Sequence, residues 1–271
     1  MSPSEVRAAL QEMGVVPDRR LGQSFLVNDD VAARIAAQVS GLGTLEIGPG
    51  LGALTSELLA SASRVTSVEI SEALCGYVSR ALDGPRFFAV RGDFLKVDPA
   101  QLPGHPFEAV AGNLPYSVSS RAMVRLTCPE FSSVRRAVLM LQTEVAVRAM
   151  TLTGGKEYGR LALALWPHFE LRRLLDTGPS SFYPQPEVNS RVVVMERRKE
   201  AVVRPGSLDS FSRLVRVGFA SRRKTLLNNL SSVVGKARAW SALSGLGISG
   251  SLRAEELPPE GFAALAEVID W

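Results

Sequence analysis

Residues 44–60 read TLEIGPGLGALTSELLA, a short apolar strand pattern that runs through three glycines into helical spacing. Glycine permits the tight turn between a strand and a helix and lets a ligand approach the main chain closely. Gly48, Gly50 and Gly52 therefore predict a ligand-binding turn. With Ala53 they also fit the dinucleotide pattern G-x-G-x-x-A, so this stretch alone does not identify the ligand.

Strand and helix patterns continue to alternate after this turn. Strands are predicted at 64–70, 86–94, 107–116 and within 132–142, with helical segments between most of them. This alternation predicts an α/β fold, in which helices cover both faces of a parallel sheet. Two extended segments around the proline-rich part of 171–198 are expected to add a terminal antiparallel hairpin. Ligands of such sheets bind at the carboxyl ends of the strands.

The last third of the chain differs from the rest in charge. Residues 191–271 contain 13 Lys and Arg against 8 Asp and Glu, a net of +5, whereas residues 1–190 contain 18 against 19, a net of −1. A local basic region is the electrostatic footprint of a nucleic-acid partner, although a solvated basic surface would give the same count. We predict a first domain over 1–200, with a helical extension at 1–40, and a basic helical domain over 201–271.

Composition disfavours several classes of protein. The two cysteines, Cys75 and Cys128, and the two histidines, His105 and His168, form no metal-binding pattern. The sequence has no run of about 18 apolar residues that would predict a membrane span. Residues 1–14 contain no apolar signal-peptide core. We therefore expect a cytoplasmic protein, monomeric by default, that uses no metal and enters no membrane.

Residues at the predicted strand ends favour one cofactor. Glu69 lies 21 residues after Gly48, where a carboxylate can accept hydrogen bonds from both hydroxyls of a ribose, as it would also in a dinucleotide enzyme. Asp93 can accept a hydrogen bond from an adenine amine, with the apolar ring of Phe94 beside it. Glu46, beneath the glycine turn, suits a cationic sulfonium and would repel a pyrophosphate. These residues favour S-adenosylmethionine, and with it a Rossmann-like class I methyltransferase sheet followed by a smaller helical domain.

The stretch NLPY, residues 113–116, suits a flat substrate that carries an amine. The exocyclic amine of a base is a poor nucleophile because its lone pair is delocalised into the ring. Two acceptors aimed at its hydrogens would free that lone pair: the side-chain carbonyl of Asn113 and the backbone carbonyl of Leu114, which Pro115 biases to an extended shape. Tyr116 offers a stacking face, and Phe182 is a candidate for a second aromatic wall. A base must be single-stranded or flipped out to reach such a site.

Eight short motifs occur in a specific order over nearly the whole chain. They are RRLGQSFLVN (19–28), EIGPGLGALT (46–55), VEI, GDF, NLPY, LQTEVAVR (141–148), FYPQPEVNS (182–190) and SRRKTLLNNL (221–230). Each motif is modest alone, but the ordered set resembles the small-subunit (16S) rRNA adenine dimethyltransferases, the KsgA or RsmA family.

This resemblance implies dimethylation of the exocyclic amines of two adjacent adenines in a 16S rRNA hairpin loop near the 3′ end, with S-adenosylmethionine as donor. It also implies a role in small-subunit assembly, a target base held between Tyr116 and Phe182, and rRNA contacts from Arg222, Arg223 and Lys224. The cofactor contacts that it implies are Ser24, Leu26, Gly48, Glu69, Asp93 and Asn113. Ser24 departs from the family pattern, which has the longer side chain of Asn here.

Several other functions are open at this stage. A mitochondrial transcription-factor relative is disfavoured because no transit-like leader is seen, and a DNA adenine or protein-glutamine methyltransferase could use an Asn-x-Pro-Tyr motif but would not explain the C-terminal match. The large-subunit (23S) rRNA adenine methyltransferases of macrolide resistance share the fold and a similar Asn-Pro motif. A ribosome-assembly factor with secondary catalysis would bind rRNA even after loss of Asn113 or Glu69. A nicotinamide-dependent dehydrogenase would use the same glycine turn, but it leaves NLPY unexplained.

Overall fold

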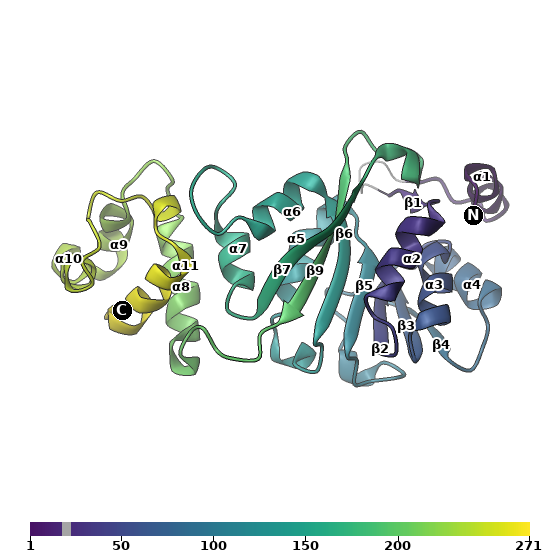
Figure 1. The fold of residues 1–271 in the computed structure, drawn as a ribbon, viewed down its shortest axis with the longest axis horizontal. Helices are drawn as coiled ribbons and strands as arrows, with labels where there is room; N and C mark the ends of the chain where they lie inside the picture. The colour runs from purple at the N-terminus through teal and green to yellow at the C-terminus, as the bar shows by residue number, and fades with distance from the viewer. Residues whose placement is uncertain (18–22) are drawn as a thin grey trace. The chain divides into compact units, whose positions relative to one another are not determined.

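The structure is a computed structural model that describes residues 1–17 and 23–271, so the first four residues of the 19–28 motif lie outside the described part. A seven-stranded sheet has the order β4-β3-β2-β5-β6-β9-β7 (Figure 1). Its strands are β2 (Gly43–Ile47), β3 (Arg64–Glu69), β4 (Phe87–Arg91), β5 (Ala109–Asn113), β6 (Arg136–Gln142), β7 (Phe169–Thr177) and β9 (Ser190–Arg197).

The predicted parallel sheet is confirmed. β2 pairs in parallel with both β3 and β5, β3 pairs with β4, and β5 pairs with β6. β9 pairs antiparallel with β6, and β7 is its outer neighbour, so the two predicted extended segments do end the sheet. Because β2 to β6 run in parallel, their carboxyl ends share one edge of the sheet.

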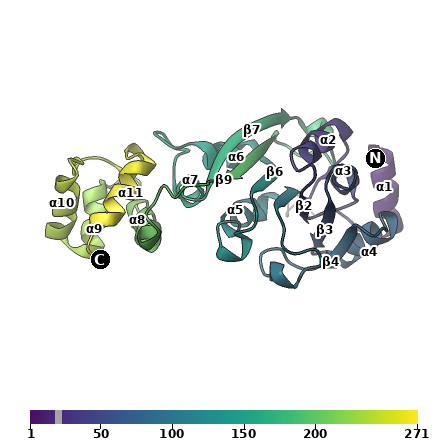
Figure 2. The same cartoon turned by 60° about the horizontal axis from the view of Figure 1, so that its bottom comes forward.

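Helices cover both faces of this sheet. In Figures 1 and 2, α2 and α3 lie on one face and α5 lies on the other. Every second residue of the central strands packs toward α2 and α3, as Val138 does against a core that contains Ile35 and Leu58. The helices of this part are α2 (Asp29–Ala37), α3 (Ala53–Ser61), α4 (Glu72–Ala81), α5 (Tyr116–Arg125) and α6 (Thr143–Met150).

Two short strands that the sequence did not predict join distant parts of the chain. β1 (Phe25–Leu26) pairs antiparallel with β8 (Phe182–Tyr183), which places Leu26 opposite Phe182. Near them, the first helix α1 (Pro3–Glu12) buries its apolar face in a small separate core. The pairing brings two motifs that are more than 150 residues apart to the same edge of the sheet.

The chain divides into two compact units, which differ from the predicted domains in one internal segment and by three residues, 198–200, at the boundary. The first unit contains Met1–Ala146 and Leu171–Arg197, and the second contains Val147–Glu170 and Arg198–Trp271. The segment Val147–Glu170 was expected in the first domain. It groups with the C-terminal helices because its apolar side chains, including the fully buried ring of Tyr158, share their hydrophobic core.

The second unit is helical, as the spacing of apolar residues predicts. Phe211, Leu230 and Phe262 come from three different helices and are buried in one core. The hydroxyl of Tyr158 donates a hydrogen bond to the carbonyl oxygen of Leu257 at 3.0 Å, so the buried phenol is satisfied. The helices are α7 (Arg160–Leu165), α8 (Leu208–Gly218), α9 (Leu226–Val234), α10 (Lys236–Gly245) and α11 (Pro259–Val268).

Candidate active site

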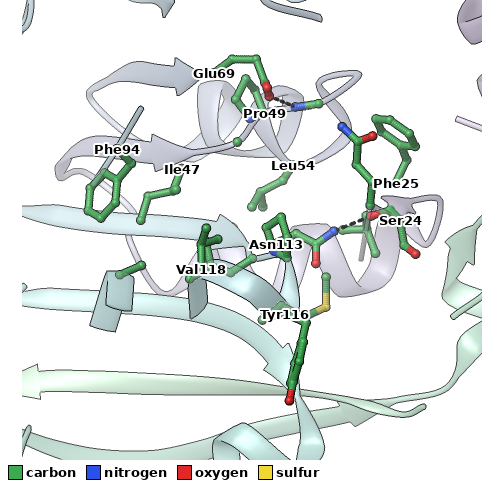
Figure 3. A pocket seen from close by; sticks show the side chains of 18 of the residues that line it. Ser24, Phe25, Ile47, Pro49, Leu54, Glu69, Phe94, Asn113, Tyr116 and Val118 are labelled. Atoms are coloured by element: carbon green, nitrogen blue, oxygen red, sulfur yellow. Dashed lines mark hydrogen bonds between the residues drawn. The ribbon is translucent and has the colours of Figure 1, made fainter. Parts of the chain in front are cut away.

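A cavity of about 280 Å³ lies in the first unit, past the carboxyl ends of β2, β3, β4 and β5. Most of the residues that the sequence singled out meet there. Twelve of them line the cavity: Ser24, Leu26, Gly48, Gly50, Glu69, Asp93, Phe94, Asn113, Leu114, Pro115, Tyr116 and Phe182. Figure 3 shows that Glu69 and Asn113 approach the same space from different strands.

The glycine turn needs glycine for two separate physical reasons. Gly48, Gly50 and Gly52 have φ values of 68°, 56° and 86°, in the left-handed region that side chains disfavour. A Cβ at Gly50 would lie 3.1 Å from the ring of Phe25, so a side chain there would also crowd the wall of the cavity. Gly52 differs from the prediction, because it does not line the cavity and instead begins α3 as its N-cap.

Glu69 ends β3 with its carboxylate held by the backbone. Oε1 accepts a hydrogen bond from the N–H of Ser71 at 2.9 Å, and Oε2 accepts one from the N–H of Gly50 at 3.3 Å (Figure 3). Burial raises the pKa of Glu69 above its ordinary value, and the backbone hydrogen bonds oppose this shift. Because each oxygen retains lone pairs beside the cavity, the carboxylate is oriented to accept hydrogen bonds from a pair of hydroxyls.

The next strand end carries Asp93 and Phe94. Asp93 turns the chain by accepting a hydrogen bond from the N–H of Leu95 at 2.9 Å. Arg125, from the last turn of α5, donates hydrogen bonds to the carbonyl oxygens of Phe94 and Val97 and lies 5.5 Å from the centroid of the Phe94 ring. Sequence reasoning missed this arginine, because its carbonyl partners lie about 30 residues away and leave no local pattern.

Asn113 is oriented by a contact that decides what its side chain can do. Its Nδ2 donates a hydrogen bond to the backbone carbonyl of Ser24 at 3.0 Å (Figure 3). The amide nitrogen is therefore engaged, and Oδ1 is the atom that is left to accept a hydrogen bond from a ligand. Ser24 supplies its main chain and not its hydroxyl, so the contact is the same whichever side chain stands at position 24.

The other three residues of NLPY form a loop and helix start that leave the ring of Tyr116 exposed. The N–H of Leu114 donates to the carbonyl oxygen of Met140 at 3.0 Å, which ties this loop to β6. Pro115 is the N-cap of α5, with an extended ψ of 147°. Tyr116 begins the helix and is 55% exposed, an unusual state for a large ring that has a cavity beside it.

Phe182 also lines the cavity but is only 3% exposed. It packs in the core that contains Leu26 and Val31, so part of its ring serves the fold. Its neighbour Ser181 accepts a hydrogen bond from the Nδ2 of Asn28 at 3.0 Å, which secures this loop to the start of α2. A stacking role for Phe182 therefore stays a prediction.

Glu46 does not line the cavity, which corrects the expected contact with a cofactor. Side chains alternate along a strand, so Ile47 reaches the cavity while Glu46 points to α3. Its Oε2 accepts hydrogen bonds from Thr55 at 2.8 Å and from Ser67 at 2.6 Å, and among the described residues its Oε1 has no partner. Burial raises the pKa of Glu46 to about 7, against the opposing effect of these two hydrogen bonds.

This buried acid predicts a pH-dependent stability. Glu46 takes up a proton on folding between its ordinary pKa of 4.5 and about 7, so the free energy of unfolding falls as the pH rises through that range. Glu46→Gln is neutral at every pH. The free energy of unfolding of the variant minus that of the wild type is expected to rise by on the order of 3 kcal/mol between about pH 5 and about pH 8, as measured by urea unfolding.

Glu72→Gln is the matched control, because Glu72 is an exposed carboxylate that pairs with Arg91 at 2.7 Å on the surface. The difference in free energy of unfolding between Glu72→Gln and the wild type is expected to change little over the same pH range. If the free energies of unfolding of Glu46→Gln and the wild type differed by the same amount at about pH 5 and about pH 8, the buried carboxylate would have an ordinary pKa.

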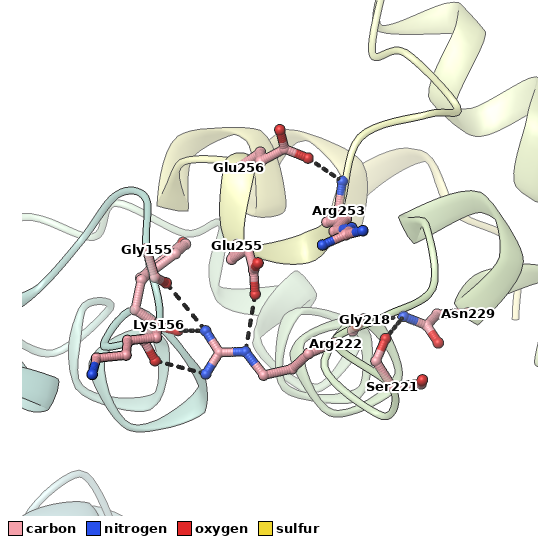
Figure 4. A network of polar contacts seen from close by, with 10 residues as sticks. Gly155, Lys156, Gly218, Ser221, Arg222, Asn229, Arg253, Glu255 and Glu256 are labelled. Atoms are coloured by element: carbon pink, nitrogen blue, oxygen red, sulfur yellow. Dashed lines mark hydrogen bonds and ion pairs between the residues drawn. The ribbon is translucent and has the colours of Figure 1, made fainter.

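The basic motif of the second unit is partly structural. Nε of Arg222 donates to Glu255 at 2.9 Å, and its Nη atoms donate to the carbonyl oxygens of Lys156, Gly155 and Tyr158 at 2.7, 3.1 and 3.0 Å (Figure 4). A guanidinium has five N–H groups, so little of Arg222 is left for RNA, contrary to its predicted role. The neighbouring Arg223 and Lys224 are exposed and stay candidates for an rRNA contact.

Asn229 gives the same motif a second structural role. It is 4% exposed, and its Nδ2 donates to the carbonyl oxygens of Gly218 at 2.7 Å and Ser221 at 3.0 Å (Figure 4). The bond to Gly218 satisfies the last carbonyl of α8, and the bond to Ser221 holds the turn that follows, where the N–H of Lys224 also donates to the Ser221 carbonyl at 3.1 Å.

Asn229→Ala is therefore expected to lower the free energy of unfolding of the full chain by about 2 kcal/mol, measured by denaturant titration. The exposed neighbour Asn228 provides a matched control, because Asn228→Ala removes no such bond and is expected to cost less than about 0.5 kcal/mol. Equal losses for the two variants would contradict a capping role for Asn229.

Other kinds of site were searched over residues 1–17 and 23–271. Within these ranges no group of three or more His, Cys, Asp and Glu side chains could hold a metal ion. No helix in the described part of the chain is long and apolar enough to cross a membrane.

The carboxylate of Glu69, at the end of β3, and the amide of Asn113, at the end of β5, both line the cavity on either side of β2, an arrangement that suits a class I methyltransferase, which brings a methyl donor to its acceptor. The chain belongs to the ribosomal RNA adenine dimethylase family, because the family model of that description matches residues 17–270. The family, the methyltransferase activity and the S-adenosylmethionine cofactor that the sequence predicted are thereby confirmed at the level of the family.

Individual relatives agree with this assignment. The "Ribosomal RNA small subunit methyltransferase A" of Moorella thermoacetica is 37% identical over 282 residues, which cover 99% of this chain and 98% of the relative. The crystal structure of the 23S rRNA methyltransferase ErmE is 31% identical, with a TM-score of 0.70, and covers 91% of this chain and 100% of that one. A dimethyladenosine transferase from Plasmodium falciparum is 24% identical, with a TM-score of 0.77 over 89% of this chain and 95% of that one, and supports the fold alone.

Proposed function

We propose that this protein dimethylates the exocyclic amines of two adjacent adenines in the 3′-terminal hairpin loop of 16S rRNA and contributes in this way to small-subunit biogenesis. The observation that carries the chemistry is the hydrogen bond from Asn113 Nδ2 to the carbonyl of Ser24, which turns Oδ1 into the free acceptor. The full-length similarity to a small-subunit methyltransferase supports the choice of rRNA. In this proposal the protein acts as a monomer in the cytoplasm.

The residues around the cavity fit S-adenosylmethionine. Glu69 would hold the ribose hydroxyls, Asp93 the adenine amine, and Phe94 would lie beside the adenine ring. Gly50 presents bare main chain to the cavity, and a Cβ there would crowd the Phe25 ring. Leu26 and the main chain at Ser24 and Gly48 complete the wall. When bound, S-adenosylmethionine supplies an electrophilic methyl group.

The protein's own part is to position and activate the amine. Oδ1 of Asn113 and the carbonyl oxygen of Leu114 accept hydrogen bonds from its two N–H groups, which localises the lone pair on nitrogen. Tyr116 stacks on the base, and Phe182 bounds the opposite side. After transfer the amine loses a proton to solvent, so no side chain is assigned as a general base. Positioning then accounts for most of the rate gain.

The experiment that tests the site is methyl transfer by Tyr116 variants. Tyr116→Ala removes the stacking face and is expected to lower kcat/KM for unmethylated small subunits by about 10-fold or more, whereas Tyr116→Phe retains most activity. The affinity for S-adenosylmethionine should be unchanged in both variants, because stacking concerns the base. Equal activity of Tyr116→Ala and the wild type would contradict a stacking role.

A second candidate function is methylation of 23S rRNA, and the similarity to ErmE is the observation that favours it. The two functions are separated by offering the protein both subunits. Transfer to 23S rRNA without transfer to the small subunit would favour the second candidate. An assembly factor with secondary catalysis is a different proposal, which predicts that Asn113→Ala still supports small-subunit maturation in cells that lack the wild-type protein.

A further inference from the structure

One aromatic side chain of the second unit belongs neither to the buried core nor to the cavity. Trp240, on α10, is 55% exposed, as exposed as Tyr116. The other two tryptophans have partners: Trp166 stacks on Phe211 with ring centroids 6.0 Å apart, and Trp271 lies 4.3 Å beneath the guanidinium of Arg213. In the part of the chain that the structure describes, Trp240 is the tryptophan without a ring or cation–π contact.

The indole of Trp240 is supported from within the unit. A Cβ built on Gly250 would lie 3.1 Å from Cζ3 of Trp240 and 3.1 Å from Cδ2 of Leu227. Glycine at position 250 therefore lets the ring rest on the turn after α10, beside a side chain of α9. A ring that is backed by main chain and open elsewhere loses little conformational entropy when it binds a flat partner.

The charge of the chain segment that carries this ring indicates the kind of partner. Residues 210–254, which include the whole of α9 and α10, contain eight Lys and Arg and no Asp or Glu. Lys236 lies one turn before Trp240 on the same side of the helix. On the same helix Arg238 pairs with Asp270 at 3.5 Å. Taken together, the second unit has 14 basic and 9 acidic residues, a net of +5, whereas the first has 17 and 18, a net of −1.

We propose that Trp240 is a base-stacking residue for rRNA, at a site in the second unit that is separate from the methylation cavity. Exposed aromatic rings in a basic surface bind unpaired bases by stacking, while Lys and Arg contact the phosphates. The site takes a single unpaired or bulged base without strong preference for its identity. This inference rests on the proposed function, because it assumes that the substrate is rRNA.

The test compares full-length Trp240→Ala and Trp240→Phe with the wild type in binding naked 16S rRNA and unmethylated small subunits at fixed salt. Trp240→Ala is expected to weaken binding to both by about 10-fold, and Trp240→Phe by much less, because phenylalanine retains a stacking face. The melting temperature and the affinity for S-adenosylmethionine should match the wild type. Phe88→Ala is the matched control, because Phe88 is a 37% exposed ring in the first unit.

Salt dependence separates stacking from charge. The loss caused by Trp240→Ala should persist as salt is raised, whereas the loss caused by Lys236→Ala should shrink, because that lysine contributes through counterion release. Unchanged binding of naked 16S rRNA by Trp240→Ala would overturn the proposal. A loss seen only with assembled subunits would also overturn it, since the partner would then be a ribosomal protein. In either case, transfer by the wild type to small subunits would leave the proposed function standing.

Discussion

Asn113→Ala is expected to lower the rate of methyl transfer at saturating small subunits by roughly 100- to 1000-fold, the size of effect seen when a preorganised polar group is removed from a reacting centre. The variant loses the Oδ1 acceptor, so the amine retains its delocalised lone pair. Binding to 16S rRNA should be retained, because the basic surface lies in the other unit. The measurement is single-turnover transfer of labelled methyl groups, with rRNA affinity determined in parallel.

Ser24 variants test whether the transfer rate depends on the hydrogen bond from Asn113 to the backbone of residue 24 or on the side chain of that residue. Nδ2 of Asn113 donates to the backbone carbonyl of Ser24, which Ser24→Ala and Ser24→Asn both keep. Their transfer rates are expected to stay close to the wild type, and the melting temperatures of all three variants should agree. If Asn113→Ala transferred methyl groups within a few-fold of the wild-type rate, the Asn113 amide would not activate the amine. A loss for Ser24→Ala as large as that for Asn113→Ala would mean that the hydroxyl and not the carbonyl matters.

Glu69→Ala is expected to weaken S-adenosylmethionine binding by about 100-fold or more, because each hydrogen bond to a charged group contributes roughly 1.5–3 kcal/mol and the carboxylate can accept two from the ribose. Titration calorimetry measures this loss directly. The affinity for 16S rRNA should not change, since Glu69 is 5% exposed and faces the cavity.

The control for this variant is Glu72→Ala, which removes a nearby carboxylate that does not line the cavity. Its cofactor affinity should equal that of the wild type. Because Glu69 also accepts hydrogen bonds from Gly50 and Ser71, the melting temperature without ligand is needed to measure any loss of order in the turn. Unchanged cofactor affinity in Glu69→Ala, with the fold intact, would assign the ribose contact to another residue.

The parallel sheet and the cavity could be predicted from sequence because their signals are local. The glycine turn at 48–52 and the polar residues at 69, 93 and 113 each follow an apolar strand run, and parallel strands bring such ends together. The direction in which a side chain points is harder to predict. Glu46 looked like a cofactor contact from its distance to the turn, but the alternation of β2 sends it to α3.

Features that depend on distant partners could not be predicted. The pairing of β1 with β8 joins segments more than 150 residues apart, and two-residue strands have too little pattern to be recognised. Arg222 looked like an RNA contact because it is basic, but its partners are main-chain oxygens of 155–158 and a glutamate at 255. The grouping of Val147–Glu170 with the C-terminal helices depends on shared burial, which spacing alone does not reveal.

The most direct test of the account uses small subunits from cells that lack this protein. The subunits are incubated with the purified full chain and labelled S-adenosylmethionine, and the modified positions are mapped along 16S and 23S rRNA. We predict two adjacent dimethyladenines in the hairpin loop near the 3′ end of 16S rRNA, and far fewer with Asn113→Ala after the same incubation time. Transfer to 23S rRNA without transfer to 16S rRNA, or dimethyladenines elsewhere in 16S rRNA, would contradict the proposed substrate.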